Sequence, residues 1–195
     1  MLTTEKEIET FYAAGRQEWR QWLQANHDKK QSIWLICYKK ECNMPTVTWS
    51  ESVDEALCFG WIDSTRKTID DQRFIQFFTR RKPTSAWSKI NKEKVARLEG
   101  EGLMAPAGLA AVSTAKQNGS WSVLDEVEEL TVPADMGKAL KAHPGAESYF
   151  ADLSRSARKS ILQWLVLAKR PETRQKRIAE IAELAGQQLK PKQFR

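Results

Sequence analysis

The sequence predicts an α+β protein in which a small antiparallel sheet of about three strands is covered by helices and followed by an all-helical C-terminal part. Residues 32–38 form a short apolar run of β-branched and aromatic residues, which is typical of a strand. Residues 61–69 and 73–79 are expected to form a hairpin across the turn sequence Asp-Asp-Gln at 70–72. From residue 85 onward apolar residues recur at helical spacing, which predicts helices and no further strand.

The first two elements follow from local patterns. Residues 5–25 carry apolar residues at helical spacing, and Thr4 with Glu7 forms a capping-box pattern at their start, so we expect one long amphipathic helix. The strand at 32–38 is apolar at nearly every position. We therefore expect it to be buried on both faces.

Three further helices are expected around the hairpin. A short helix begins at Ser50 or Ser52, both good capping residues, and ends at Gly60, which can adopt the left-handed conformation that closes a helix. Another begins at Ser85, and a third begins at Pro106, since proline is favoured in the first turn.

The C-terminal part begins after an acidic connection with little pattern, residues 120–133. Pro133 is expected to start a helix, and a chain end after residue 189 is expected to be frayed. This organisation predicts an α+β core domain at 1–125 and a helical region at 135–195. The last three helices are expected at 147–153, 154–170 and 172–189.

Charge is unevenly distributed along the 195 residues, whose net charge is +6. Residues 66–97 hold 10 basic and 3 acidic residues, and residues 151–195 hold 11 basic and 4 acidic residues. Such blocks attract phosphates and acidic partners, so an anionic small molecule, an acidic protein or nucleic acid could be the partner. The alternative is that these cations are solvated faces of helices and strands.

The N-terminal 30 residues are charged throughout and contain no apolar core of a secretory signal. The longest uncharged apolar stretch, 161–168, is far shorter than the ~20 residues that cross a bilayer. The cysteines are three, an odd number, and two lie in apolar surroundings, which favours reduced thiols. A cytoplasmic location without a membrane span is therefore expected.

Cys58 is the only plausible nucleophile, but no general base is brought to it by the sequence. The two histidines, His27 and His143, are predicted in loops at helix ends. Cys58 is also expected at a helix C-terminus, where the dipole raises the pKa of a thiol. A buried structural cysteine is favoured, no catalytic residue is assigned, and an enzyme with a cleft near Cys58, Asp63 and Arg81 stays an alternative.

No metal or cofactor site is expected. Cys37 and Cys42 lack the spacing of a zinc pair, and paired histidine motifs are absent. The glycine-rich fingerprints of dinucleotide and nucleoside triphosphate sites are absent as well.

The strongest candidate for a binding site is the junction after the second hairpin strand. Three consecutive cations there precede a helix whose free N–H groups could hold an anion, and a tryptophan, a serine and an asparagine follow. The alternative is a core tryptophan beside solvated cations. With two residues of the neighbouring strand, the predicted ligand-binding set is Trp61, Asp63, Arg80, Arg81, Trp87, Ser88 and Asn91.

Several segments resemble the YdeI/OmpD-associated family, whose members are also labelled bacteriocin-protection proteins. One departure is Phe-Thr-Arg-Arg at 78–81, where the family pattern has Phe-Thr-Pro-Arg. The similar segments follow the family's order over nearly the whole chain: EWRQWLQANH at 18–27, VDEALCFGWIDS at 53–64, SAWSKIN at 85–91, GLMAPAGL at 102–109, LSRS at 153–156 and AKRPETR at 168–174.

The resemblance implies the fold and a bacterial origin, and it transfers no catalytic residue. The family label implies a role in tolerance of antimicrobial peptides and an association with a porin. We therefore expect a non-enzymatic binding protein linked to envelope or antimicrobial-peptide stress, with a nucleic-acid-binding accessory protein as the first alternative.

Overall fold

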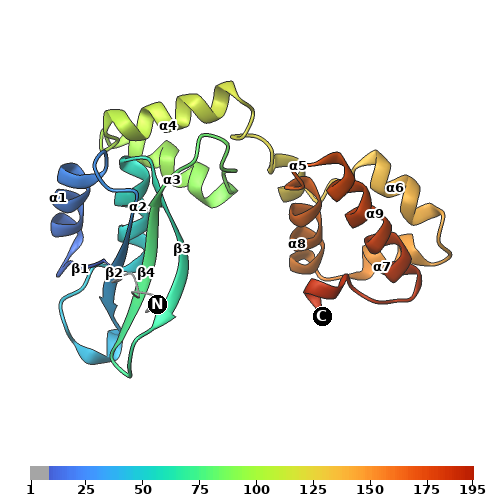
Figure 1. Cartoon of the computed structure of the whole chain (residues 1–195), viewed down its shortest axis with the longest axis horizontal. Helices are drawn as coiled ribbons and strands as arrows, with labels where there is room; N and C mark the ends of the chain where they lie inside the picture. The colour runs from blue at the N-terminus through green and yellow to red at the C-terminus, as the bar shows by residue number, and fades with distance from the viewer. Residues whose placement is uncertain (1–8) are drawn as a thin grey trace, which may run out of the picture. The chain divides into compact units, whose positions relative to one another are not determined.

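The computed structural model describes residues 9–195, which form two compact units, one ending at Trp121 and one spanning Ser122–Arg195 (Figure 1). The first unit combines a sheet with helices α1 to α4, and the described part of the second contains helices and turns without a strand. The α+β class and the helical C-terminal part are as predicted.

Within residues 9–195 the sheet has four strands in the order β1-β2-β4-β3. They are β1 (Thr10–Tyr12), β2 (Ser32–Tyr38), β3 (Trp61–Thr68) and β4 (Arg73–Arg80). The β3–β4 hairpin matches the prediction, and β2 pairs antiparallel with β4. β1 pairs with β2 in parallel, so the sheet is mixed and not purely antiparallel.

The predicted helix at 5–25 is wrong over residues 9–15. Helix α1 spans Arg16–Asn26, and the chain before it is extended in β1. The proposed capping box of Thr4 and Glu7 lies outside the described residues.

The apolar spacing that suggested one helix belongs to a strand and a helix that pack together. The ring of Phe11 in β1 lies 6.2 Å from that of Trp19 and 5.6 Å from that of Trp22, both on α1. β1 packs against the helix that follows it, so Phe11 joins an aromatic cluster with Trp19 and Trp22.

β2 was expected to be buried on both faces, but it is buried on one. Ile33, Leu35 and Cys37 are at most 1% exposed. The alternate residues Ser32, Trp34, Ile36 and Tyr38 are half-buried. The strand therefore separates a helix-covered face from a more open one.

Helix α2 spans Trp49–Cys58, and its cap is Thr48 instead of a serine. The Thr48 hydroxyl accepts from the N–H of Glu51, whose side chain bonds back to the Thr48 N–H, which completes a capping box. Ser52 is buried and donates to the Trp49 carbonyl. Gly60 ends the helix as predicted, with a φ of +73°.

Helix α3 spans Lys89–Gly100 and α4 spans Pro106–Gln117. α4 begins at the predicted proline. α3 begins four residues later than predicted, because Ser88 and not Ser85 caps it by accepting from the N–H of Asn91. The N–H of Ser85 instead bonds to the carbonyl of Lys82 in a turn.

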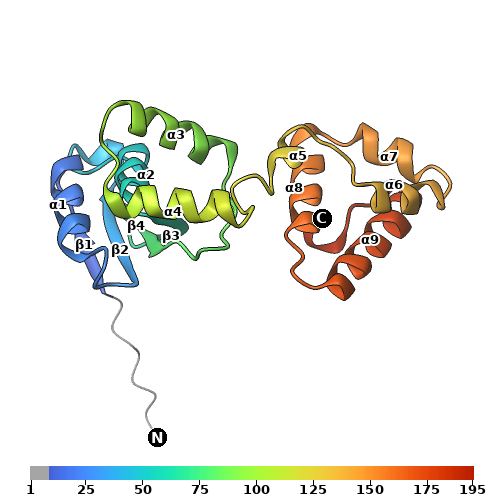
Figure 2. The same ribbon diagram turned by 90° about the horizontal axis from the view of Figure 1, so that it is seen from above.

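The core of the first unit lies between one face of the sheet and its helices. Figure 2 shows α2 and α3 on one side of the sheet. Three tryptophans fill the centre of this layer: Trp19, Trp61 and Trp87, each at most 2% exposed.

The second unit is built from helices: α5 (Asp125–Glu128), α6 (Ala134–Lys141), α7 (Ala146–Asp152), α8 (Arg155–Val166) and α9 (Pro171–Gly186). α5 falls within the segment that was expected to be a plain connection. The chain end is packed and not frayed: the N–H of Lys192 bonds to Glu180 at 3.0 Å, and Phe194 lies edge-on to Trp164.

Candidate anion-binding site

The two arginines of the predicted site lie at the end of the central strand β4. Arg80 is the last residue of the strand and pairs with Trp61 of β3, and the N–H of Arg81 donates to the Gly60 carbonyl at 2.9 Å. The backbone of both residues is therefore anchored to the turn between α2 and β3.

A single carbonyl at the end of α1 organises the side chains beside this turn. His27 is the C-cap of α1, and its carbonyl accepts from Trp61 Nε1 at 3.2 Å and from Arg80 Nε at 2.9 Å. A guanidinium at the carbonyl end of a helix is favoured by the helix dipole. Within residues 9–195 that contact uses Nε, which leaves the terminal nitrogens of Arg80 available to a ligand.

Arg81 is held flat against an aromatic ring. Its guanidinium carbon lies 3.6 Å from the ring centroid of Trp87, and Nη1 donates to the Ala86 carbonyl at 3.2 Å. Its Nε is buried and has no hydrogen-bond partner among the described residues. Burial lowers the pKa of Arg81 to about 10, with an opposing contribution from Asp63, so the side chain stays cationic at neutral pH.

Arg81 separates two adjoining pockets. The larger, of about 290 Å³, also touches Arg80, and the smaller, of about 80 Å³, also touches Trp87. Both reach Ala111 of α4. The larger pocket is lined by His27, Asp28, Phe59, Gly60, Arg80, Arg81, Ala107 and Ala111, and the smaller by Arg81, Lys82, Pro83, Trp87, Ala111 and Thr114.

The remaining predicted residues lie near the end of β4 but outside the two pockets. Ser88 and Asn91 form the cap of α3 and line neither pocket. Trp61 is fully buried, and Asp63 accepts from Trp49 Nε1 at 3.0 Å. The structure thus brings Arg80, Arg81 and Trp87 together and leaves the other four beside the pockets.

The sequence did not reveal the other walls of these pockets. His27 comes from α1, Gly60 from the turn after α2, and Ala107 and Ala111 from one face of α4. A sequence signal existed only for Gly60, as a helix stop. Small residues on α4 let that helix approach the turn: the alanine side chains at 107 and 111 leave space where larger ones would fill the pocket.

Cys58 is buried, as the sequence predicted, and none of the described pockets includes it. Its surroundings are Arg20 and Glu55, and burial raises the pKa of its thiol. The two pockets at Arg81 are lined by neither Cys58 nor Asp63, so they are not the suggested cleft of Cys58, Asp63 and Arg81.

A thiol count tests this burial. Cys37 and Cys58 are buried and Cys42 is half-buried, and burial raises the pKa of Cys37 to about 11. We expect one cysteine to react quickly with a thiol reagent at neutral pH and two to react only on unfolding. A Cys42→Ser variant should abolish the fast phase. Fast labelling that survives in this variant would show that Cys58 or Cys37 is accessible.

Many cations of the two basic blocks are already in contact with acceptors. In the first block, Lys94 and Arg97 both bind Asp54, a buried carboxylate of α2. In the second, Lys159 bonds to Glu128 at 2.7 Å and Arg174 bonds to Asp135 at 2.8 Å. Charge counts along the sequence therefore overstate the free positive charge of these surfaces.

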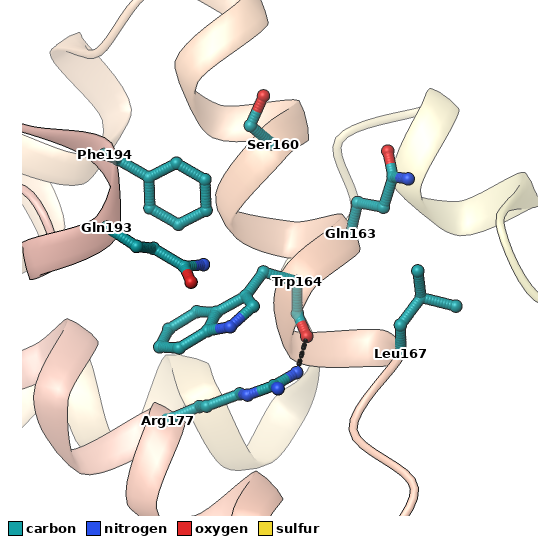
Figure 3. Close-up of a pocket in the computed structure, with 7 residues that line it drawn as sticks. All are labelled: Ser160, Gln163, Trp164, Leu167, Arg177, Gln193 and Phe194. Carbon is teal, nitrogen blue, oxygen red and sulfur yellow. Dashed lines mark hydrogen bonds between the residues drawn. The ribbon is translucent and has the colours of Figure 1, made fainter. Parts of the chain in front are cut away.

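A second hollow, of about 440 Å³, lies in the C-terminal unit around Trp164. Figure 3 shows the Trp164 indole between Arg177 on one side and Gln193 and Phe194 on the other. The Arg177 guanidinium donates to the Trp164 carbonyl and lies 4.6 Å from its ring, so its charge is directed at the protein itself. The candidate site is therefore placed at Arg81.

No group of three or more His, Cys, Asp and Glu side chains within residues 9–195 is arranged to hold a metal ion. Of the helices in the same range, none has the length and apolar character required to cross a membrane.

Two family models match the chain. A domain of unknown function, DUF8412, matches residues 11–111, more than half of the chain, and the model described as bacteriocin-protection, YdeI or OmpD-associated matches residues 129–188. No curated protein and no solved structure gives a match. The two matches fall in the two structural units in turn: the chain belongs to the family defined by DUF8412, and its C-terminal unit carries a domain that matches the YdeI or OmpD-associated model.

Proposed function

We propose that the chain is a non-enzymatic binding protein that holds a small anionic ligand at the corner formed by Arg80 and Arg81. The observation that carries the proposal is the state of Arg81: a cation stacked on Trp87, projecting between two pockets, with a buried Nε that has no partner within residues 9–195. A buried donor left unsatisfied costs about 1–3 kcal/mol, which a ligand oxygen would recover.

The size and polarity of the pockets define the class of ligand. The larger one, about 290 Å³, is at the lower end of the range for small-molecule sites. The two guanidinium groups at its wall favour a planar carboxylate or a phosphate group, which arginine binds with two parallel hydrogen bonds. The apolar wall of Phe59, Ala107 and Ala111 would contact the uncharged part of such a ligand.

The proposal predicts that a substitution at position 81 can weaken ligand binding without lowering the stability of the fold. Arg81→Met keeps the apolar stem over Trp87 but removes a buried charge, a change that is often neutral or stabilising in a protein interior. We expect binding of inorganic phosphate, sulfate or a short dicarboxylate, measured by calorimetry, to weaken about tenfold or more. The melting temperature without ligand should stay the same or rise.

Two variants control this experiment. Arg81→Lys keeps the charge but loses the planar donor pair, so it should weaken binding in the same direction. Lys89→Met removes an exposed cation at the start of α3, away from both pockets, and should change nothing. A loss of stability in Arg81→Met with unchanged binding would show that Arg81 serves only to pack Trp87.

The cellular role follows from the family description. Because that description names bacteriocin protection, we extend the proposal to a cytoplasmic role in envelope or antimicrobial-peptide stress. The three unpaired cysteines are compatible with a reducing compartment. Cells lacking the gene should lose tolerance to a bacteriocin, and wild type but not Arg81→Met should restore it. Equal rescue by wild type and Arg81→Met would mean that the stress role does not depend on ligand binding at Arg81.

A further inference from the structure

The sheet of the N-terminal unit has one face free of helices among the described residues (Figures 1 and 2). The half-buried residues of β2 point to this face, among them Trp34 and Ile36. Their partners on β4 are Phe77 and Ile75, and directly opposed residues of an antiparallel pair lie on the same face. The two central strands therefore present an apolar and aromatic surface away from the core.

The geometry of this surface is that of an aromatic platform. The rings of Trp34 and Phe77 have centroids 4.7 Å apart with an interplanar angle of 43°. Tyr38 and Tyr12 extend the surface along β2 and β1, edge to face at 5.6 Å, and Tyr12 is 37% exposed. Ile75 belongs to this surface and not to the main core cluster, although it is only 8% exposed.

Two cations accompany the aromatic residues. Lys67 of β3 pairs with Ile75, and its Nζ lies 5.0 Å from the ring centroid of Trp34, so its stem crosses over the isoleucine. Arg73 lies opposite Tyr38 on the same face and bonds to Asp70 in the hairpin turn. Arg73 is paired with Asp70, and the described residues of the four strands that point to this face include no carboxylate, so Lys67 supplies the positive charge that an anionic partner would meet.

We propose that this face, which is separate from the Arg81 corner, binds single-stranded nucleic acid. Unpaired bases would stack on Trp34 and Phe77, and Lys67 would contact a phosphate. A duplex keeps its bases stacked inside the helix and cannot use such a platform. A second copy of the chain would bring a second Lys67 and, from its strands, no carboxylate to pair with the first.

The test uses the full chain, fluorescein-labelled single-stranded RNA and DNA homopolymers, and fluorescence anisotropy at low salt. Trp34→Leu and Phe77→Leu keep an apolar residue but remove the ring, and each should weaken binding about tenfold. Lys67→Gln should reduce the slope of log affinity against log salt by about 0.7, the value for one phosphate contact on a single strand.

Matched variants off this face should leave binding unchanged. Trp49→Leu removes an exposed tryptophan on α2, and Lys89→Gln removes an exposed cation on α3. Arg81→Met should also have no effect, which keeps this test independent of the ligand corner. Thermal melting of every variant checks that loss of binding is not loss of fold.

Four results would overturn the proposal. The first is no single-strand binding by the wild type at about 50 mM salt, and the second is equal affinity for single strands and duplex. The third is an equal loss of affinity in the variants on this face and in the control variants. The fourth is a dimer in sedimentation velocity that Trp34→Leu dissociates. The last would assign the face to a second copy of the chain.

Discussion

Gly108→Ala is expected to destabilise the N-terminal unit by about 3 kcal/mol, the upper end of the usual cost of overpacking. A Cβ at this position would lie 2.3 Å from the carbonyl oxygen of Cys58, 2.7 Å from its carbonyl carbon and 2.8 Å from the Leu57 carbonyl oxygen. All three are backbone atoms, which cannot turn aside as a flexible side chain can. α4 would have to move away from the end of α2, which would strain the 3.0 Å hydrogen bond from the Ala105 N–H to the Cys58 carbonyl.

The matched control is Gly100→Ala in α3. Nothing lies within 4 Å of a Cβ added there, and the residue is helical, so alanine should be neutral or stabilising by up to about 1 kcal/mol. Urea denaturation followed by circular dichroism measures both. If Gly108→Ala unfolds at the same urea concentration as Gly100→Ala, then α4 is not in close contact with the end of α2.

Glu55→Ala is expected to cost about 2–3 kcal/mol of unfolding free energy. The Glu55 side chain is 1% exposed and receives hydrogen bonds from Arg16 and Arg20, both at 2.5 Å. Removing one partner from a buried charge network leaves the others uncompensated, which costs about 3–5 kcal/mol when all members are buried. The two arginines are 37% and 32% exposed, and water can solvate part of their charge, so the expected cost is lower.

Glu101→Ala gives the comparison for an exposed pair. Glu101 bonds to Arg97 one helical turn away at 3.0 Å, and both side chains are more than 40% exposed. Such pairs contribute about 0.3–0.5 kcal/mol, so this variant should unfold almost at the wild-type urea concentration. Equal effects of Glu55→Ala and Glu101→Ala would mean that the Glu55 network is solvated.

The Glu55 network also connects stability to the candidate site. Arg16 and Arg20 belong to α1, so their contacts with Glu55 hold α1 against α2. The C-cap of α1 is His27, whose carbonyl positions Arg80. Loss of Glu55 is therefore expected to loosen the wall of the larger pocket without changing any residue that lines it.

Elements defined by residues close in sequence were predicted well. The β3–β4 hairpin needs only the turn at 70–72, where the Asp70 carboxylate accepts from the N–H groups of Gln72 and Arg73. α4 begins at Pro106, because proline has no N–H to satisfy and its φ suits the first turn. In both cases the determining interactions lie within a few residues, and a pattern in the sequence is sufficient.

Elements defined by distant partners were not predicted. β1 is three residues long and exists because it pairs in parallel with β2, more than 20 residues away. The apolar residues of β2 gave no indication that only one face is covered, since Trp34 and Ile36 are as apolar as the buried residues between them. Which face the helices cover depends on tertiary packing.

For the candidate site, the sequence by itself determined its cations: Arg80, Arg81 and Lys82 are consecutive, and Trp87 follows within a short turn. Only the tertiary structure decided what surrounds them. His27, Gly60 and Ala111 are each more than 20 residues from Arg81 and meet it because α1, the end of α2 and α4 converge at one end of the sheet. Ser88 and Asn91, close in sequence, bond to each other to cap α3, since an exposed helix start satisfies its own N–H groups with the nearest hydroxyl.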